Sequence, residues 1–380
     1  MQDKPPISTP SAPSRRDAAR QLLHASRIAE SVRLGKQASL RNSALAGLQA
    51  AIAAGIALAA FQLSPWSHLM GFASLGALVA LFGRFAPTRS RIAIVLQCAC
   101  WQTVAVAAMS ATAWAGWSHS AQLMLLAVSC GAYLFICFKG KFGAPGPLIF
   151  IFAVGASMTD TLTLEQVAQR TAATAIAVAF AWLVCILSER LRHTPNDRPG
   201  LPVEPDVPMS HLWRMTLRMA LAALAVVFIA DHLGLQFPAW AAMGTVAVMQ
   251  GRHLHISMHR ALQRMVGTVF GALIAWLLLE QDPSIWILIA ALMMFQFCTE
   301  VVIGFNYGLA QALVTPMALL MTHLAAPNAA ITTLAPERVV DTMLGAIIGM
   351  VVALALSSIE DRQTLALHHQ SVMPPDRPRR

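Results

Sequence analysis

The sequence predicts an all-α integral membrane protein with about twelve transmembrane helices, arranged as two tandem six-helix parallel repeats. Hydrophobic residues make up 57% of the 380 positions. Charged residues make up only 12%, against about 25% in soluble domains. The apolar residues form twelve separate runs, and most basic residues lie between alternate runs. These observations favour a multi-pass helical protein over a soluble domain.

Residues 1–42 form a basic N-terminal segment ahead of the first apolar run. Residues 1–13 are rich in Pro, Ser and Thr, and no apolar signal sequence begins the chain. Residues 14–41 place Arg and Lys among Leu, Ile and Val. This pattern predicts a basic helix on the cytoplasmic leaflet, with a solvated helix that only sets orientation as the alternative.

The twelve apolar runs divide into two units. The first unit, 43–188, holds runs at about 43–62, 67–82, 92–115, 121–138, 144–158 and 167–187. A proline-rich cytoplasmic linker, 189–210, separates it from the second unit, 211–358, and a cytoplasmic tail follows at 359–380. The second unit holds runs at about 212–230, 238–250, 261–279, 284–299, 302–321 and 339–357. Several runs are shorter than the roughly 20 residues that a spanning helix needs, so ten spans is the alternative count.

Charge distribution supports the count of twelve. With both termini in the cytoplasm, 25 of the 27 Lys and Arg residues fall on the cytoplasmic side. Only Arg170 and Arg338 fall on the outer side, where acidic residues such as Glu337 and Asp341 gather. We expect these two acids to stabilise a helix N-terminus. A further expectation concerns the tryptophans near the outer boundary, which should form an aromatic belt: Trp66, Trp117, Trp240 and Trp286.

Short matches in the same order indicate that the two units repeat. Gly83-Arg84 corresponds to Gly251-Arg252, and the run at Glu165–Ala177 corresponds to the run at Glu337–Gly349. An even number of spans in each unit gives a parallel repeat about an axis along the membrane normal. The same alignment sets Lys139 against Glu300, which predicts an ion pair at the inner mouth. That pair, with His253, is the candidate coupling or gating group, and a purely structural pair is the alternative.

The most informative stretch runs from Gly251 to Leu279, where a basic, histidine-rich turn leads into an apolar helix. Arg260, Arg264, Gly267 and Gly271 recur at helical spacing and share one side of that helix. The small residues Gly267, Gly271, Gly345 and Gly349 are expected to allow close helix packing. The candidate anion path consists of Arg84, Lys141, Arg252, Arg260 and Arg264, because such a cationic vestibule would concentrate carboxylates. Plain orientation signalling is the alternative for each of these residues.

The sequence gives little sign of disulfides or of metal, nucleotide or nucleic-acid binding. The six cysteines lie inside apolar runs and none forms a CxxC pair. His253, His255 and His259 could bind a metal, but no acid lies within the motif, so we expect no metal and no cofactor. The chain contains no GxxxxGK[ST] nucleotide-binding motif. The basic residues lie in short blocks between apolar runs, which argues against a nucleic-acid partner.

Four pieces of the second unit carry a family resemblance. They are PAWAAMGTVAVMQG at 238–251, RALQRMVGTVFGALIAWLL at Arg260–Leu278, NYGLAQALVTPMALLM at 306–321 and ERVVDTMLGAIIGMVVALAL at 337–356. Together they resemble the fusaric acid resistance protein-like (FUSC) family of bacterial inner-membrane proteins, which includes aromatic acid exporters. That family is also similar to the plant aluminium-activated malate transporters. The resemblance is good over 210–357 and faint over 43–187, where the Gly-Thr signature is missing.

The resemblance implies six-helix membrane units that export organic anions, in some members with a periplasmic adaptor protein. The chain lacks the large cytosolic regions that long members carry after each membrane unit. We therefore expect a bacterial inner-membrane exporter of small organic anions, with aromatic carboxylic acids as substrates and the proton gradient as driving force, and no enzyme activity. The alternatives are a passive anion channel, a metal-dependent membrane enzyme using the histidine cluster, and a transport-inactive assembly subunit. The sequence does not identify the substrate, and it leaves a periplasmic adaptor and a homo-oligomer as possible partners. The protein is expected to lie in the lipid bilayer.

Overall fold

The computed structural model describes residues 13–22, 35–194, 206–251, 254–325 and 331–372, and all regular structure in them is helical. The first unit contains α3 (Leu40–Gln62), α4 (Met70–Ala77), α5 (Thr88–Trp114), α6 (His119–Lys139), α7 (Leu148–Ala156) and α8 (Leu164–Leu187). The second contains α9 (Met209–His232), α10 (Pro238–Met249), α11 (Leu254–Leu279), α12 (Ile285–Val302), α13 (Tyr307–Ala325) and α14 (Ile331–Ala355). The prediction of an all-helical multi-pass membrane protein is confirmed.

Nine helices of the described residues are long and apolar enough to cross a membrane, where the sequence predicted about twelve. The other three predicted spans form α4, α7 and α10, of 8, 9 and 12 residues. Prolines and glycines limit them: Pro147 and Pro238 fix the starts of α7 and α10, and Gly83 follows the 3₁₀ turn that extends α4. Twelve residues of α-helix cover only about 18 Å.

The segments that contain the short helices nevertheless carry the chain from one end of the bundle to the other. Asn42, in the first turn of α3, donates to the carbonyl of Arg84, which follows α4, at 3.1 Å. Gln122, in the first turn of α6, donates to the carbonyl of Thr159, which follows α7, at 2.8 Å. The chain therefore returns to its starting end after α4 and changes ends again along α7.

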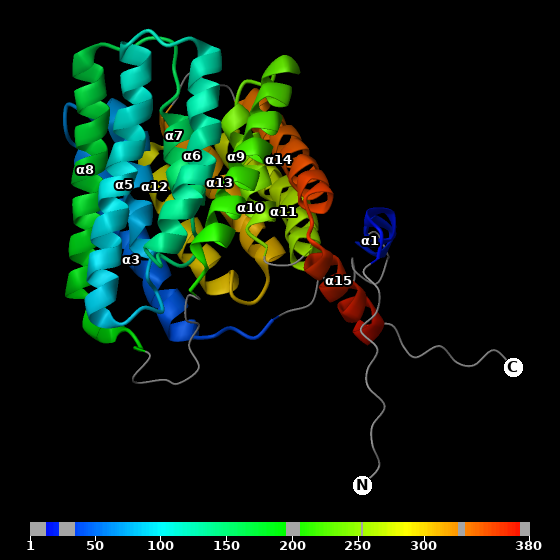
Figure 1. The fold of residues 1–380 in the computed structure, drawn as a ribbon. Coiled ribbons are helices and arrows are strands. Elements are labelled where there is room, and N and C mark those ends of the chain that lie inside the picture. The colour runs from blue at the N-terminus through cyan, green and yellow to red at the C-terminus, as the bar shows by residue number, and fades with distance from the viewer. Residues whose placement is uncertain (1–12, 23–34, 195–205, 252–253, 326–330, 373–380) are drawn as a thin grey trace, which may run out of the picture.

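The two units use the same helix contacts, with helix numbers shifted by six. Within the units, α5 packs on α8 as α11 packs on α14, and α4 packs on α8 as α10 packs on α14. Between the units, α3 packs on α12 as α9 packs on α6, and α4 packs on α13 as α10 packs on α7. This correspondence is the contact pattern of two repeats related by a pseudo-two-fold axis. Figure 1 shows the helices of both units in one bundle.

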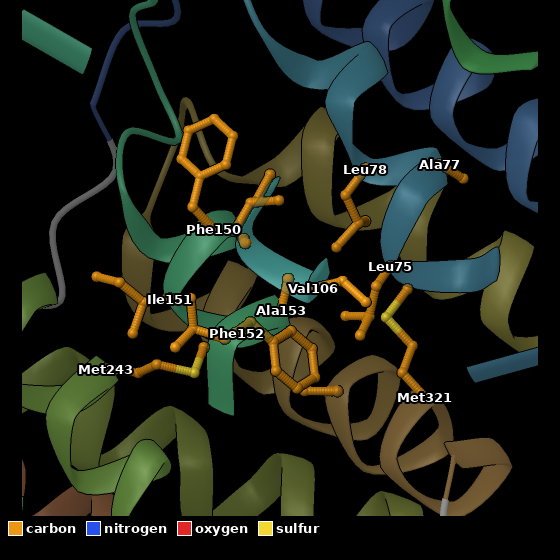
Figure 2. Packing of buried hydrophobic residues seen from close by; sticks show 14 of the residues in the cluster. Leu75, Ala77, Leu78, Val106, Phe150, Ile151, Phe152, Ala153, Met243 and Met321 are labelled. Carbon is orange, nitrogen blue, oxygen red and sulfur yellow. The ribbon is translucent and has the colours of Figure 1, made fainter. Parts of the chain in front are cut away.

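The short helices form the centre of this bundle. All eight residues of α4 are buried, as is every residue of α10 except Met249. Side chains from α4, α7, α10 and α13, among them Leu75, Phe152, Met243 and Met321, meet in one hydrophobic core (Figure 2). Neighbouring helices thus shelter the short elements from lipid, which is where broken helices are tolerated in membrane proteins.

The two ends of the bundle differ in charge. We call one the basic end, with Arg84, Arg91, Lys141 and Arg192, and the other the acidic end, with Asp160, Glu165, Asp231 and Glu280. At the basic end, α1 (Arg15–Leu22) packs against α15 (Ile359–Val372), and apolar side chains of both contact α11 and α14. Arg362 donates to the carbonyl of Pro13 at 3.2 Å. The described part of the predicted basic helix is thus docked on the protein.

Candidate functional site

A buried ion pair joins the two units at the basic end. Arg84, after α4, pairs with Glu300 of α12, and the two side chains are only 8% and 4% exposed. The predicted partner of Glu300 was Lys139, and that prediction is wrong, because Lys139 is exposed at the end of α6. The packing explains the difference. Helix α12 lies on α3, where Gly47 sits against the Glu300 side chain, whereas α6 lies on α9.

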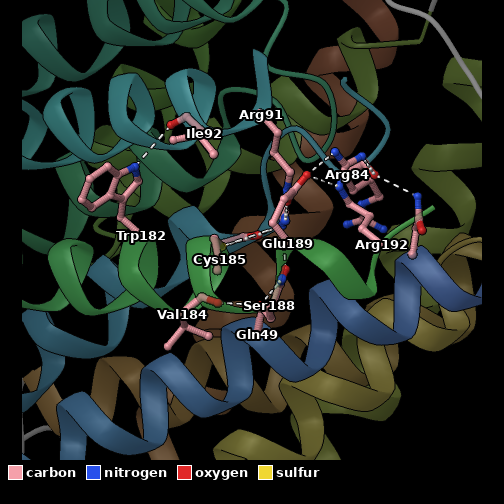
Figure 3. A network of polar contacts seen from close by, with 12 residues as sticks. Gln49, Arg84, Arg91, Ile92, Trp182, Val184, Cys185, Ser188, Glu189 and Arg192 are labelled. Carbon is pink, nitrogen blue, oxygen red and sulfur yellow. Dashed lines mark hydrogen bonds and ion pairs between the residues drawn. The ribbon is translucent and has the colours of Figure 1, made fainter. Parts of the chain in front are cut away.

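A second network at the same end ties α3, α5 and the end of α8 together (Figure 3). The guanidinium of Arg91 donates to Glu189 Oε2 at 2.8 Å and to Gln49 Oε1 at 2.6 Å. Arg192 donates to the other oxygen, Oε1, at 2.5 Å. Burial opposes ionisation of Glu189, but hydrogen bonds from Arg192 and Arg91 outweigh it and hold its pKa below the ordinary value. The network fixes the basic end of the first unit.

The predicted anion-path cations have separate partners on different elements. Arg84 is neutralised by Glu300. Lys141 lies 2.7 Å from Asp206, and its hydrogen bond lowers the pKa of that exposed carboxyl. Arg260 is partly buried on α11. Arg252 and His253 lie outside the described residues. Pairing with acids leaves Arg84 and Lys141 less available to an anion than the sequence suggested.

Arg264 has a different environment, deep in the second unit. Its side chain, on α11, is 2% exposed, and Nη1 donates to the Tyr307 hydroxyl at 3.2 Å and to Gln311 Oε1 at 3.3 Å. Its Nε and Nη2 have no hydrogen-bond partner among the described residues. Gly267 and Gly271 face α13, where an added Cβ would lie 2.6 Å from atoms of Gly308 and Thr315. These glycines bring the partners of Arg264 within reach.

Arg338 of α14 lies nearby and is 0% exposed. Its Nε, Nη1 and Nη2 all lack hydrogen-bond partners within the described ranges, and it is close enough to Arg264 to interact electrostatically. Both carboxylate oxygens of Asp341 are also buried there without a hydrogen-bond partner in the described residues. Gly345 and Gly349 hold α14 against α10, with a Cβ at Gly345 placed 2.1 Å from the Ala241 carbonyl.

We refer to Arg264 and Arg338 as the arginine pair. Charged groups inside a membrane are costly, and buried polar groups almost always have partners. Five guanidinium nitrogens of the pair break this rule. An arginine fork binds a carboxylate through two parallel N–H···O bonds. The arrangement therefore offers charge and unused donors to a small anion.

A cavity of about 410 Å³ opens at the acidic end between the two units. We call it the outer cavity. Its lining comes from α4, α7 and α8 of the first unit and from α10 and α13 of the second. Four aromatic side chains and one arginine line it: Phe72, Phe152, Phe237, Trp240 and Arg170.

The two units place an arginine against an aromatic ring in corresponding positions. Arg170 of α8 lies over Phe72, the third residue of α4, with Cζ 4.9 Å from the ring centroid. Arg338 of α14 lies over Trp240, the third residue of α10, at 5.1 Å. Arg170 lines the outer cavity. In the second unit Trp240 lines the cavity and Arg338 does not. Trp240 thus stands between the cavity and the arginine pair.

Three tryptophans of the predicted aromatic belt are exposed, and the fourth is buried. Trp66, Trp117 and Trp286 are about half exposed, at 51%, 48% and 50%. Trp240 is 3% exposed, because α10 lies in the centre of the bundle. Sequence reasoning therefore missed Phe72, Trp240, Arg170 and Arg338 as site residues. A signal was present, since Arg170 and Arg338 are the two cations that break the one-sided charge distribution.

The histidine cluster is only partly described. His255 and His259 lie one turn apart on α11, with ring centroids 6.5 Å apart. The described residues contain no group of three side chains that could hold a metal ion. The third histidine, His253, lies outside them, so the predicted cluster is not tested as a whole.

Comparison with known proteins bears on the same half of the chain. Residues 223–352 match the sequence model of the fusaric acid resistance protein-like family. The chain is thus similar to this family over about a third of its length. The matched segment runs from the middle of α9 almost to the end of α14, and so contains Trp240 and the arginine pair. The nine long apolar helices of the described residues make the chain a multi-pass membrane protein.

One curated relative is an uncharacterized membrane protein, YvaC, of Bacillus subtilis (strain 168). It is 34% identical over 132 residues, which is 33% of this chain and 20% of the relative. The match thus spans about a fifth of that protein. No solved structure matches the chain significantly. Residues 223–352, which we call the fusaric acid resistance protein-like segment, therefore combine the sequence similarity with the arginine pair.

Proposed function

We propose that this protein transports small organic anions across the bacterial inner membrane, with aromatic carboxylic acids as substrates. The observation that carries the proposal is the arginine pair, whose buried guanidinium nitrogens lack hydrogen-bond partners among the described residues. The fusaric acid resistance protein-like segment contains both arginines. A carboxylate would supply the missing charge and acceptors, and its release would leave the pair available again.

The direction of transport follows from the charge of the two ends. The basic end faces the cytoplasm under the positive-inside rule, which also places both termini there. An inside-negative membrane potential then drives an anion outward, by about 2.3 kcal/mol per charge for each 100 mV. Export is thus favoured by the electrical part of the proton gradient.

Protonation of Asp341 is expected to affect anion binding. Its carboxylate lies within electrostatic reach of Arg338 and would compete with a bound anion for the guanidinium. Protonation of Asp341 removes that competition, and a bound anion in turn favours the proton. The proton and the anion therefore bind together at this site. A proton that crossed with a monoanion would cancel its charge, so export driven by the membrane potential requires that the Asp341 proton does not cross with the anion.

Uptake of labelled aromatic carboxylates into inverted membrane vesicles tests the proposal. A lumen-positive potential imposed with potassium and valinomycin should increase uptake, and vesicles without the protein give the background. Flux that follows only the concentration gradient and potential, with no saturation, would identify an anion channel. Absence of flux for every anion, with the protein shown to be folded, would contradict the proposal and leave the enzyme and assembly-subunit alternatives.

A further inference from the structure

The outer cavity has the size of a small-ligand site. Its volume of about 410 Å³ lies in the range of roughly 300–1,000 Å³ found for ligand pockets. It lies where α7 and α10 meet across the two units, and an added Cβ at Gly155 would lie 2.3 Å from Ala239. Both units contribute walls, so a ligand here would contact both sides of the pseudo-two-fold axis.

Arg170 gives the cavity a fixed cation. Its Nη1 donates a long hydrogen bond of 3.4 Å to the Ser157 carbonyl, and the residue lines the cavity. The contact with Phe72 orients the guanidinium from behind. A planar guanidinium in a partly enclosed site binds a carboxylate better than an ammonium would.

Other charged groups near the cavity are weaker. His119 lines the rim, where it lies 3.2 Å from the Asp231 carboxylate. Asp160 also lines the cavity but is exposed, so solvent screens its charge. Acids at the rim disfavour dianions more than monoanions, while Arg170 attracts one carboxylate.

The remaining walls are suited to a flat ring. Phe72 and Phe152 are 4% and 6% exposed, so their rings are fixed by packing. Phe237 and Trp240 stack with centroids 4.3 Å apart and an interplanar angle of 18°. Aromatic rings pack against one another in stacked and edge-on arrangements that add to simple burial. An aromatic ligand would gain these contacts, whereas a saturated ring would not.

We propose that the outer cavity is a binding site for an aromatic monocarboxylate, with the carboxylate on Arg170 and the ring among Phe72, Phe152 and Trp240. The role of the site in transport rests on the proposed function. In that role the ligand waits beside Trp240, whose ring contacts Arg338. Binding of the ligand to the outer cavity can be measured without transport.

Protection of an introduced thiol tests this site. Gln236 lines the cavity and is exposed, so Gln236→Cys in a variant without the six native cysteines provides a reporter. Gln281→Cys, exposed at the same end but outside the cavity lining, is the matched control. The full-length protein in detergent is treated with a maleimide in the presence of benzoate, cyclohexanecarboxylate or benzamide.

Benzoate should slow labelling of Gln236→Cys at least five-fold at saturation and leave Gln281→Cys unchanged. Cyclohexanecarboxylate and benzamide should protect much less, since each lacks one of the two features. Arg170→Gln should abolish protection by benzoate, and Arg170→Lys should restore part of it. Equal protection by all three compounds, or none by benzoate, would overturn the inference. Protection without vesicle uptake would support the binding site and count against the transport proposal. Uptake without protection would support transport and overturn the binding site.

Discussion

Arg338 lies over the indole ring of Trp240, and this contact separates the arginine pair from the outer cavity. The guanidinium has no hydrogen-bond partner in the described part of the chain, so the ring stabilises it together with the nearby Asp341 carboxylate. A cation over an indole gains about 0.5–2 kcal/mol. An anion can displace such a contact, which makes Trp240 suited to be a gate.

Removal of the indole should expose Arg338. In the wild-type protein an arginine-specific dicarbonyl reagent should modify exposed arginines such as Arg214 and spare Arg338. Trp240→Ala should allow modification of Arg338, while Trp240→Phe, which keeps a ring, should preserve protection. Peptide mass spectrometry reads each site, and Arg214 serves as the internal control. Modification of Arg338 in the wild type at the rate of Arg214 would refute the gating role.

Asp341 should limit anion affinity through its negative charge. Asp341→Asn removes the carboxylate that competes with the substrate and should lower KM at neutral pH, by roughly five-fold for about 1 kcal/mol of lost repulsion. The KM of the wild type should fall as pH falls, and the variant should lose that pH dependence. Glu280→Gln, an exposed acid at the same end, provides the control. A higher KM in Asp341→Asn would mean that Asp341 supports binding instead.

The pair of Arg84 and Glu300 should contribute mainly to stability. Because both side chains are buried, Glu300→Gln leaves Arg84 unpaired and should cost roughly 3–5 kcal/mol. The double variant Arg84→Met/Glu300→Leu should recover most of that loss, since it removes both charges together. The midpoint of thermal unfolding in detergent measures both effects. Strictly additive losses would show that the two residues do not interact.

Glu189 should make the protein sensitive to acid. Its pKa is lowered in the folded state, so its ion pairs stabilise the protein above the unfolded pKa of about 4.3 and are lost as pH falls through the folded pKa. The wild type should therefore lose thermal stability below about pH 4.3 more steeply than Glu189→Gln. Glu165→Gln, at the exposed start of α8, is the control. Parallel pH profiles for wild type and Glu189→Gln would contradict this assignment.

The fold class could be predicted from the sequence because hydropathy and charge are local properties of each segment. The apolar runs, their order and the alternation of ends depend on local composition, and the structure has a helix in every predicted run. Lengths were harder to predict. Runs such as 67–82 look like spans, but glycine and packing divide that run into 3₁₀ and α pieces that only neighbours can shelter.

The site depended on tertiary contacts that local patterns do not contain. Arg264 was identified from its spacing with Gly267 and Gly271 on one helix face. Its distance from Arg338, some 70 residues later, is set by how α11 and α14 pack. Likewise, the partner of Glu300 follows from the contact of α12 with α3, which the repeat alignment alone could not reveal.

The most direct test of the account is saturable uptake of labelled benzoate by inverted vesicles carrying Arg264→Gln or Arg338→Gln. Each substitution removes charged hydrogen bonds worth about 1.5–3 kcal/mol, so kcat/KM should fall roughly ten- to a hundred-fold. Arg214→Gln, which changes an exposed arginine of α9, should leave uptake unchanged at equal protein amount. Unchanged uptake in both arginine-pair variants, with Arg214→Gln behaving as wild type, would contradict the account.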